Sequence, residues 1–384
     1  MMNLKKKHKK LMSKKFLSML IGGTLTMMVV SILLMSDSII AGLFIGSNAV
    51  AGITLVTPIY SLAAFFGSVF ALGVPIVYDT EMGKFNKKKA DQSFGFGLLM
   101  AITIGVGLFI LITILGDIYL RSNNPLVDVL EQGRGYLKWM RFTILVMPLQ
   151  MVLAALVYSD GDETLSTLAN VIQGAGNIVL SIILSQRFGI SGIALSSFLF
   201  NIVSLLILAI HFFKKSNSLK INLYFSRKLL KDVGRLSIID SSSYLFLSFL
   251  TFALNAFVSV RFGTEFLIIV SVISLVREFQ LIFDGIGEAI TPILSVYIGE
   301  ESISGVKSIY SLANKTAIIE GIVVTIILFI CAPLIPKMLD ITDATLLKAS
   351  ITCIRVLSLG STFVCLHLIF LLMWHLNQLF YYYL

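Results

Sequence analysis

Charged residues are scarce in this chain. Only 13% of its 384 residues are Asp, Glu, Lys or Arg, whereas 57% are hydrophobic; a soluble domain has about 25% charged and about 45–50% apolar residues. The three cysteines have no CxxC spacing, so neither a zinc site nor a disulfide framework is indicated. No HExxH, GxxxxGKS or GxSxG motif occurs. These absences argue against a soluble enzyme and against a pump driven by ATP.

Long apolar segments make up most of the chain. Each is close to the ~20 residues that an α-helix needs to cross ~30 Å of hydrocarbon, and the two longest would tilt or extend beyond the bilayer. We therefore predict an all-α polytopic membrane protein that is not an enzyme. The ten expected transmembrane helices are at residues 16–40, 50–77, 95–117, 136–158, 165–186, 190–213, 236–260, 265–297, 316–338 and 350–376.

The net charge of +9 is distributed unevenly along the chain. With the N-terminus in the cytoplasm, 20 of the 30 Lys and Arg fall on cytoplasmic segments and six on external ones. This asymmetry is the positive-inside pattern and predicts that both termini are cytoplasmic. The basic stretches either only set the topology or also contact anionic lipid headgroups. We expect the lipid bilayer, and no nucleic acid, as a partner.

The two halves of the chain resemble each other at an offset of 217 residues. The matching pairs are Gly46 and Gly263, Pro75 and Pro292, and Tyr136-Leu137-Lys138 and Cys353-Ile354-Arg355. Because the second copy begins after an even number of spans, the repeats are parallel, as in several secondary transporters.

A polar stretch divides six spans from four. We predict a basic cytoplasmic N-terminus at 1–15, a six-helix bundle at 16–213, a cytoplasmic connector at 214–235 and an incomplete four-helix bundle at 236–384. The offset places counterparts of spans five and six near 382–430. The chain is therefore expected to be truncated at its C-terminus relative to a complete pair of bundles.

Asp37 is the sharpest candidate for chemistry. It lies in the outer part of the first span, and a charge facing lipid there would cost several kcal/mol on the order of the insertion scales. A carboxylate in a wet cavity at this place can bind a proton or a sodium ion. The alternative is a helix-end residue that reaches the outer interface.

Two other spans carry polar residues. Span five has Asn170, Gln173, Asn177 and Ser181 at steps of three and four, hence on one face. That face either takes part in function or makes interhelical hydrogen bonds.

Span eight has Arg277, Glu278, Asp284 and Glu288 as possible cavity charges. These either line a cation path or lie near cytoplasmic water. The acidic turn from Tyr158 to Thr164 lacks the later ligands of a calcium loop, so we expect a solvated turn.

These features resemble the multidrug and toxic compound extrusion (MATE) family. The first helix ends with an Asp and a turn containing Gly, here Asp37 to Gly46, and the fourth-to-fifth helix turn is similar to Tyr158–Asp162. The fifth-helix Asn-x-x-x-Asp pattern corresponds to Asn177 and Ser181, and a later Gly-x-x-Gly segment to Gly189–Ser197.

The resemblance implies two helical bundles facing a central cavity and export of organic cations in exchange for H+ or Na+. It implies that Asp37 is the main cation acceptor, with Asn177 as an amide partner and Ser197 where many members have Thr. Ser181 stands where many members have Asp, so the usual coupling by two carboxylates is in doubt. No cofactor is implied, and no metal beyond a possible Na+ at Asp37.

The sequence thus predicts a multi-pass antiporter of the plasma membrane (inner membrane). It would export xenobiotic organic cations in multidrug efflux and act as a monomer. One alternative is a flippase of related fold for lipid-linked oligosaccharides, which would need a more basic cavity. Another is a truncated membrane protein that transports nothing.

Overall fold

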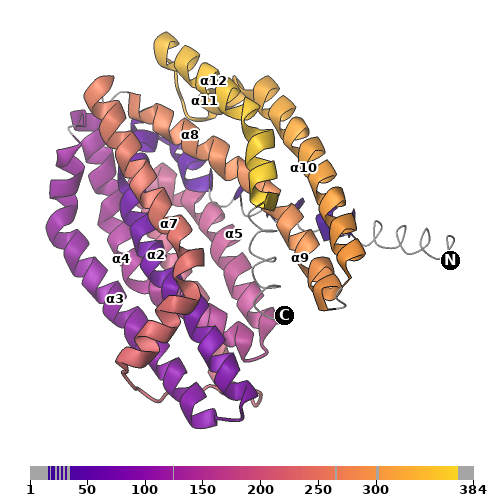
Figure 1. The fold of residues 1–384 in the computed structure, drawn as a ribbon. Coiled ribbons are helices and arrows are strands. Elements are labelled where there is room, and N and C mark those ends of the chain that lie inside the picture. Colours follow the sequence, from indigo (N-terminus) through magenta and orange to yellow (C-terminus); the bar gives the residue numbers. More distant parts are fainter. Residues whose placement is uncertain are drawn as a thin grey trace. The chain divides into compact units, whose positions relative to one another are not determined.

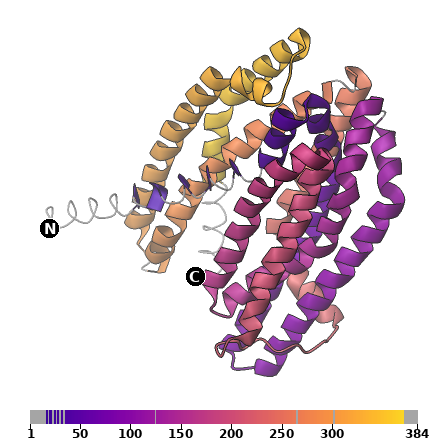
Figure 2. The ribbon, with the colours of Figure 1, turned by 180° about the vertical axis from the view of Figure 1, so that it is seen from behind.

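The computed structural model describes residues 16–370, except 18, 22–23, 26, 29–30, 33–34, 124, 264–265 and 300–301. This part of the chain is helical and contains no β-strand (Figures 1 and 2). The predicted all-α membrane fold is confirmed. The elements are α2 (Ser47–Gly83), α3 (Lys87–Ser122), α4 (Val127–Ser159), α5 (Glu163–Phe188), α6 (Ile190–Ala209), η1 (Ile210–Phe213), α7 (Arg227–Arg261), α8 (Leu267–Gln280), η3 (Leu281–Phe283), α9 (Asp284–Gly299), α10 (Ile303–Cys331), α11 (Leu334–Met338) and α12 (Ala344–Leu359).

Eight helices in the described ranges are long and apolar enough to cross a membrane. Of the first expected span, the segment Met35–Phe44 forms a shorter apolar helix. The basic N-terminus at 1–15 and the chain after 370 lie outside the described residues. The number of ten spans therefore stays a prediction.

The eighth expected span differs from the prediction of one long helix at 265–297. It is divided into α8, the 3-10 turn η3 and α9. Asp284 and two glycines, Gly285 and Gly287, follow η3 directly. Glycine costs about 1 kcal/mol in a helix relative to alanine, so this stretch is a weak point for a continuous helix.

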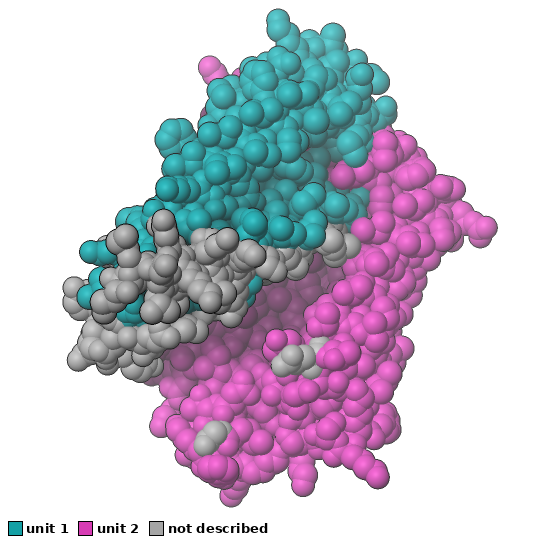
Figure 3. Space-filling model, turned by 90° about the vertical axis from the view of Figure 1, so that its right-hand side faces the viewer, with its two compact units in different colours: residues 1–36, 272–384 teal, residues 37–271 magenta. Residues whose placement is uncertain are grey.

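The chain separates into two compact units, coloured differently in Figure 3. Unit 1 comprises Met1–Ser36 and Val272–Leu384, and unit 2 comprises Asp37–Ser271. α7 thus belongs to unit 2 together with α2–α6. The bundle boundaries expected from the repeat, 16–213 and 236–384, stay a prediction.

Unit 2 is organised around α2. This helix packs against α3, α4 and α7, while α6 packs against both α4 and α5 (Figures 1 and 2). Phe94, Phe96 and Leu156 are fully buried in its apolar core. In contrast, α3 exposes Ile110, Ile114 and other apolar side chains at helical spacing. Such a face is suited to contact with lipid, because hydrocarbon cannot form hydrogen bonds with polar groups.

The internal repeat has structural counterparts in unit 2. Gly46 and Gly263 both have positive φ, 123° and 103°, and Gly46 directly precedes α2. The hydroxyls of Thr54 on α2 and Ser271 on α8 hydrogen-bond to each other, and these residues are also 217 positions apart. Equivalent residues of the two repeats therefore meet directly in a buried position.

Unit 1 contains α9, α10, α11 and α12, with α10 between α9 and α12 in its contacts. Hydrogen bonds join segments of this unit. Thr325 donates to the carbonyl oxygen of Ser358 at 2.8 Å, and Gln280 donates to the Ser361 hydroxyl at 2.8 Å. Such bonds between membrane helices contribute about 0.6 kcal/mol each.

Candidate cation-coupling site

Asp37 is held in unit 2 by a tyrosine of α4. The Tyr136 hydroxyl donates to Oδ2 of Asp37 at 2.8 Å. The other carboxyl oxygen, Oδ1, is buried and has no hydrogen-bond partner among the residues that the structure describes. Because an uncompensated buried carboxylate oxygen is costly, this atom is suited to hold a proton or a cation.

The turn between α5 and α6 brings polar residues of these two helices next to each other. Gly189 ends α5 and caps α6 with a φ of 57°, a conformation that residues with a Cβ rarely adopt. The chain therefore reverses within one residue, and the Ser196 hydroxyl donates to the backbone oxygen of Asn177 at 2.8 Å. This bond fixes α6 against α5 at the level of the candidate site.

The structure brings Asn177, Ser181 and Ser197 together. The side-chain oxygen of Asn177 accepts from Ser181 at 3.2 Å and from Ser197 at 3.4 Å. The Ser197 hydroxyl also approaches the Asp37 carboxyl. Around one carboxylate, the site thus offers neutral hydroxyl and amide oxygens, which are ligands that hard cations accept.

A second polar group lies further along the same helices. Gln150 of α4 donates to the side-chain oxygen of Asn170 on α5 and to the Ser204 hydroxyl on α6, both at 3.1 Å. Asn170 belongs to the polar face predicted for span five. Part of that face therefore makes interhelical hydrogen bonds, and part contributes to the Asp37 site.

The predicted charges of span eight belong to unit 1. Arg277 and Glu278 lie in the last turn of α8, and Asp284 begins α9. The backbone oxygen of Glu278 accepts a hydrogen bond from Ser31 at 2.7 Å. Glu288 lies on α9, but its side chain is outside the described part of the structure.

Tyrosines at the site were not predicted as functional residues. The sequence identified Tyr136 only as a member of the internal repeat. Its hydroxyl nevertheless donates to Asp37, which lies 99 residues away in the sequence. Tyr60 of α2 is close enough to Asp37 to interact electrostatically. A tyrosine inside an apolar span has many structural uses, so no sequence signal marks these two.

In the described ranges, no three or more His, Cys, Asp or Glu side chains form a group that could hold a metal ion. The geometry instead consists of one carboxylate, two tyrosines nearby and several neutral oxygen donors.

The chain is similar in sequence to known multidrug transporters. Residues 24–185 match the MatE family model. Over 71% of its length, the chain is 23% identical to the multidrug export protein MepA of Staphylococcus aureus (strain MRSA252). Along its N-terminal part, the chain is similar to the MATE family.

Solved structures of this family share the fold. An inward-facing multidrug resistance MATE transporter is 21% identical, with a TM-score of 0.81 over 89% of this chain and 80% of that one. A MOP superfamily transporter from Pyrococcus furiosus, described by a reversed polarity of its binding pocket and a suggested different function, is 22% identical, with a TM-score of 0.69 over 92% and 80%.

The match to MepA covers 62% of that relative's length. The chain is thus a multi-pass membrane protein whose N-terminal part carries the family match and most of the candidate site. Its fold is that of the solved transporters.

Proposed function

We propose that this chain is a secondary active multidrug efflux antiporter that exports organic cations in exchange for H+ or Na+. Asp37 is the cation acceptor, and Asn177, Ser181 and Ser197 supply neutral oxygens beside it. The observation that carries the proposal is the buried Oδ1 of Asp37, which has no partner among the described residues while Oδ2 is held by Tyr136.

The exchange follows from charge balance. A buried carboxylate is stabilised when a proton or Na+ binds it, and it is costly when that cation leaves. Cation binding and release at Asp37 therefore favour different arrangements of the surrounding helices, and a ligand shifts such an equilibrium by its differential affinity. With Ser181 in place of a second carboxylate, one such charge change accompanies each cycle.

The membrane context is proposed from the same features. The chain lies in the plasma membrane with both termini in the cytoplasm, as the 20-to-6 asymmetry of Lys and Arg predicts. It acts as a monomer, and Arg277, Glu278, Asp284 and Glu288 contribute charges along the substrate path. Their mainly acidic character favours cationic cargo.

The test compares two Asp→Asn variants in cells that lack other efflux pumps. Asp37→Asn removes the acceptor and is expected to abolish export of a cationic dye. Asp117→Asn is the matched control, because Asp117 is 48% exposed and pairs with Arg121 and Arg134 at the surface of α3. Unchanged efflux by Asp37→Asn, at equal expression, would refute the role of Asp37.

The oligosaccharide flippase is the second candidate, and the solved MOP transporter with reversed pocket polarity shows that pocket charge varies within this fold. A flippase would move an anionic lipid-linked sugar and leave resistance to cationic dyes unchanged. A chain that transports nothing would show neither activity.

A further inference from the structure

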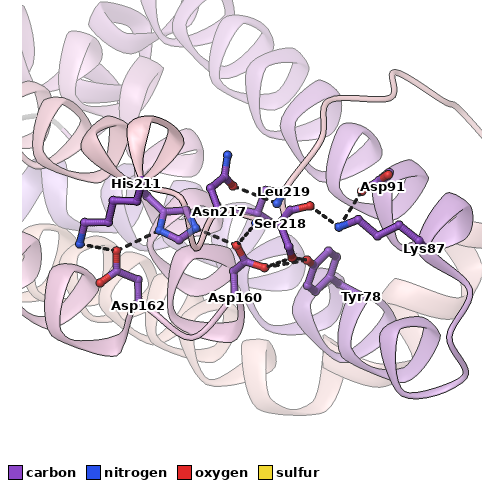
Figure 4. Close-up of polar contacts among 10 residues, drawn as sticks. Tyr78, Lys87, Asp91, Asp160, Asp162, His211, Asn217, Ser218 and Leu219 are labelled. Carbon is purple, nitrogen blue, oxygen red and sulfur yellow. Dashed lines mark hydrogen bonds and ion pairs between the residues drawn. The ribbon is translucent and has the colours of Figure 1, made fainter.

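Residues 214–226 link η1 to α7 without forming a helix, and polar contacts fasten them to unit 2 (Figure 4). The backbone N–H of Ser218 donates to Oδ2 of Asp160 at 2.8 Å, and its hydroxyl bonds to the same carboxylate. The carbonyl oxygen of Ser218 accepts from Lys87 of α3, and Asp160 also accepts from Tyr78 of α2 at 2.9 Å. The 214–226 segment is therefore tied to the α4–α5 turn and to α3.

The same group of polar residues holds the point where the segment begins. Nε2 of His211, in η1, is 2.8 Å from Oδ2 of Asp160, and Nδ1 is 2.9 Å from Oδ2 of Asp162. Lys214 donates to Asp162 at 2.7 Å. The end of α6 and the first residue of the segment are thus both bonded to the α4–α5 turn.

Apolar packing fixes the rest of the segment against α3. Leu219 is buried within the apolar core of the unit. A Cβ at Gly95 of α3 would collide with the carbonyl oxygen of Asn222, so backbone lies against backbone there. Further along, the ring of Phe225 is 6.1–6.2 Å or closer to its neighbour in the sense of a ring contact with Phe96, at 6.2 Å between centroids. Side chains that the segment turns outward are therefore displayed from a fixed backbone.

The outward side chains are bulky and apolar as well as basic. Phe213, Ile221 and Leu223 are 89%, 65% and 67% exposed. Lys215 and Lys220 lie between them in the sequence and are exposed too. Exposed apolar groups that gather at one place mark a surface for a partner or a membrane. Aromatic residues and lysines together are typical of the membrane–water interface, where the rings lie at headgroup level and the ammonium groups reach water.

The charge of this region is strongly positive. Residues 214–235 contain seven Lys or Arg and a single acidic residue, Asp232. Lys214 is paired with Asp162, but Lys215 and Lys220 form no ion pair with any residue that the structure describes. Their charge is available for an anionic partner.

The position of the segment favours a lipid as that partner. η1 ends the apolar span Ile190–Phe213, so the segment begins where a membrane span ends. Setting the topology requires the charge of the lysines, but it does not require Phe213 and Leu223 to be held exposed beside them. An anionic phospholipid offers both a phosphate group for the lysines and acyl chains for the apolar side chains.

We propose that Phe213 and the 214–226 segment form a binding surface for an anionic phospholipid. Lys215 and Lys220 contact its phosphate group, and Phe213, Ile221 and Leu223 contact the upper part of its acyl chains. With the proposed topology this surface faces the cytoplasmic leaflet, where anionic lipids attract basic segments. The surface is separate from the cation site proposed at Asp37 and does not depend on transport.

The test measures lipid binding to the full chain by native mass spectrometry, with phosphatidylglycerol and phosphatidylcholine as probes. Wild type is expected to retain phosphatidylglycerol in preference. The double variant Lys215→Gln/Lys220→Gln should bind it roughly tenfold more weakly or worse, because each basic residue near an anionic surface adds to the attraction. Lys307→Gln/Lys337→Gln is the matched control, since it removes two exposed lysines of unit 1 and should bind as wild type.

A second measurement asks whether the apolar side chains enter the lipid. In liposomes that contain phosphatidylglycerol, the tryptophan of Leu223→Trp should be quenched by lipids brominated near the headgroup, beyond the quenching of the two native tryptophans in wild type. Equal loss of phosphatidylglycerol binding in both double variants, no loss in Lys215→Gln/Lys220→Gln, or no added quenching in Leu223→Trp would overturn the proposal.

Discussion

The substitution Asp160→Asn tests the electrostatic account of unit 2 most severely. Asp160 and His211 have side chains that are 3% and 0% exposed, and Asp160 accepts four hydrogen bonds. Asparagine has the same shape but no charge, and its NH2 group would face donors. Removing the charged partner from such a buried polar cluster leaves donors without an acceptor and costs about 3–5 kcal/mol.

Equilibrium unfolding in mixed detergent micelles can measure this loss of stability. Asp117→Asn is the control, since an exposed ion pair contributes about 0–1 kcal/mol. We expect Asp160→Asn to lower the free energy of unfolding by several times the control value. A loss below about 1 kcal/mol would show that the cluster in Figure 4 does not hold the turn as described.

Three further outcomes follow from individual contacts. The stability that Asp160 and Asp162 contribute is present above pH ~4, where the carboxyls of the unfolded chain are ionised. It is lost as the pH falls through their lowered pKa values in the folded protein. In unfolding measurements over a pH series, the difference in stability between wild type and Asp160→Asn should therefore shrink below pH ~4. Tyr136→Phe removes the donor to Asp37, a bond to a charged group worth about 1.5–3 kcal/mol, and should lower dye efflux about tenfold or more, whereas normal efflux would remove Tyr136 from the site. Ser181→Asp adds a carboxylate beside Asn177 and should change the number of cations exchanged per substrate in a flux measurement; an unchanged ratio would contradict a coupling role for this position.

The sequence predicted the membrane fold well because the cost of polar groups in hydrocarbon leaves few choices. Apolar segments of sufficient length must be helices, and the same cost singled out Asp37. Asn177 and Ser181 were predicted from the polar face of span five, Ser197 followed from the family resemblance, and the structure brings the three together. The long eighth span was predicted wrongly because hydropathy does not register the glycines after η3.

Partners far apart in the sequence could not be predicted. Tyr136 bonds to Asp37 across 99 residues, and His211 reaches Asp160 across 51. The turn at Asp160 was expected to be solvated because turns with Asp and Gly normally are. Its burial arises from tertiary packing of α2, α6 and the following segment, which no local pattern reveals.

The central claim is that Asp37 couples cation movement to export. The most direct measurement is dye transport into proteoliposomes of the full chain, driven by an imposed H+ or Na+ gradient, for wild type and Asp37→Asn side by side. The account predicts transport that follows one of the two gradients in wild type and is lost in Asp37→Asn. Gradient-driven transport of equal rate in the variant would contradict it.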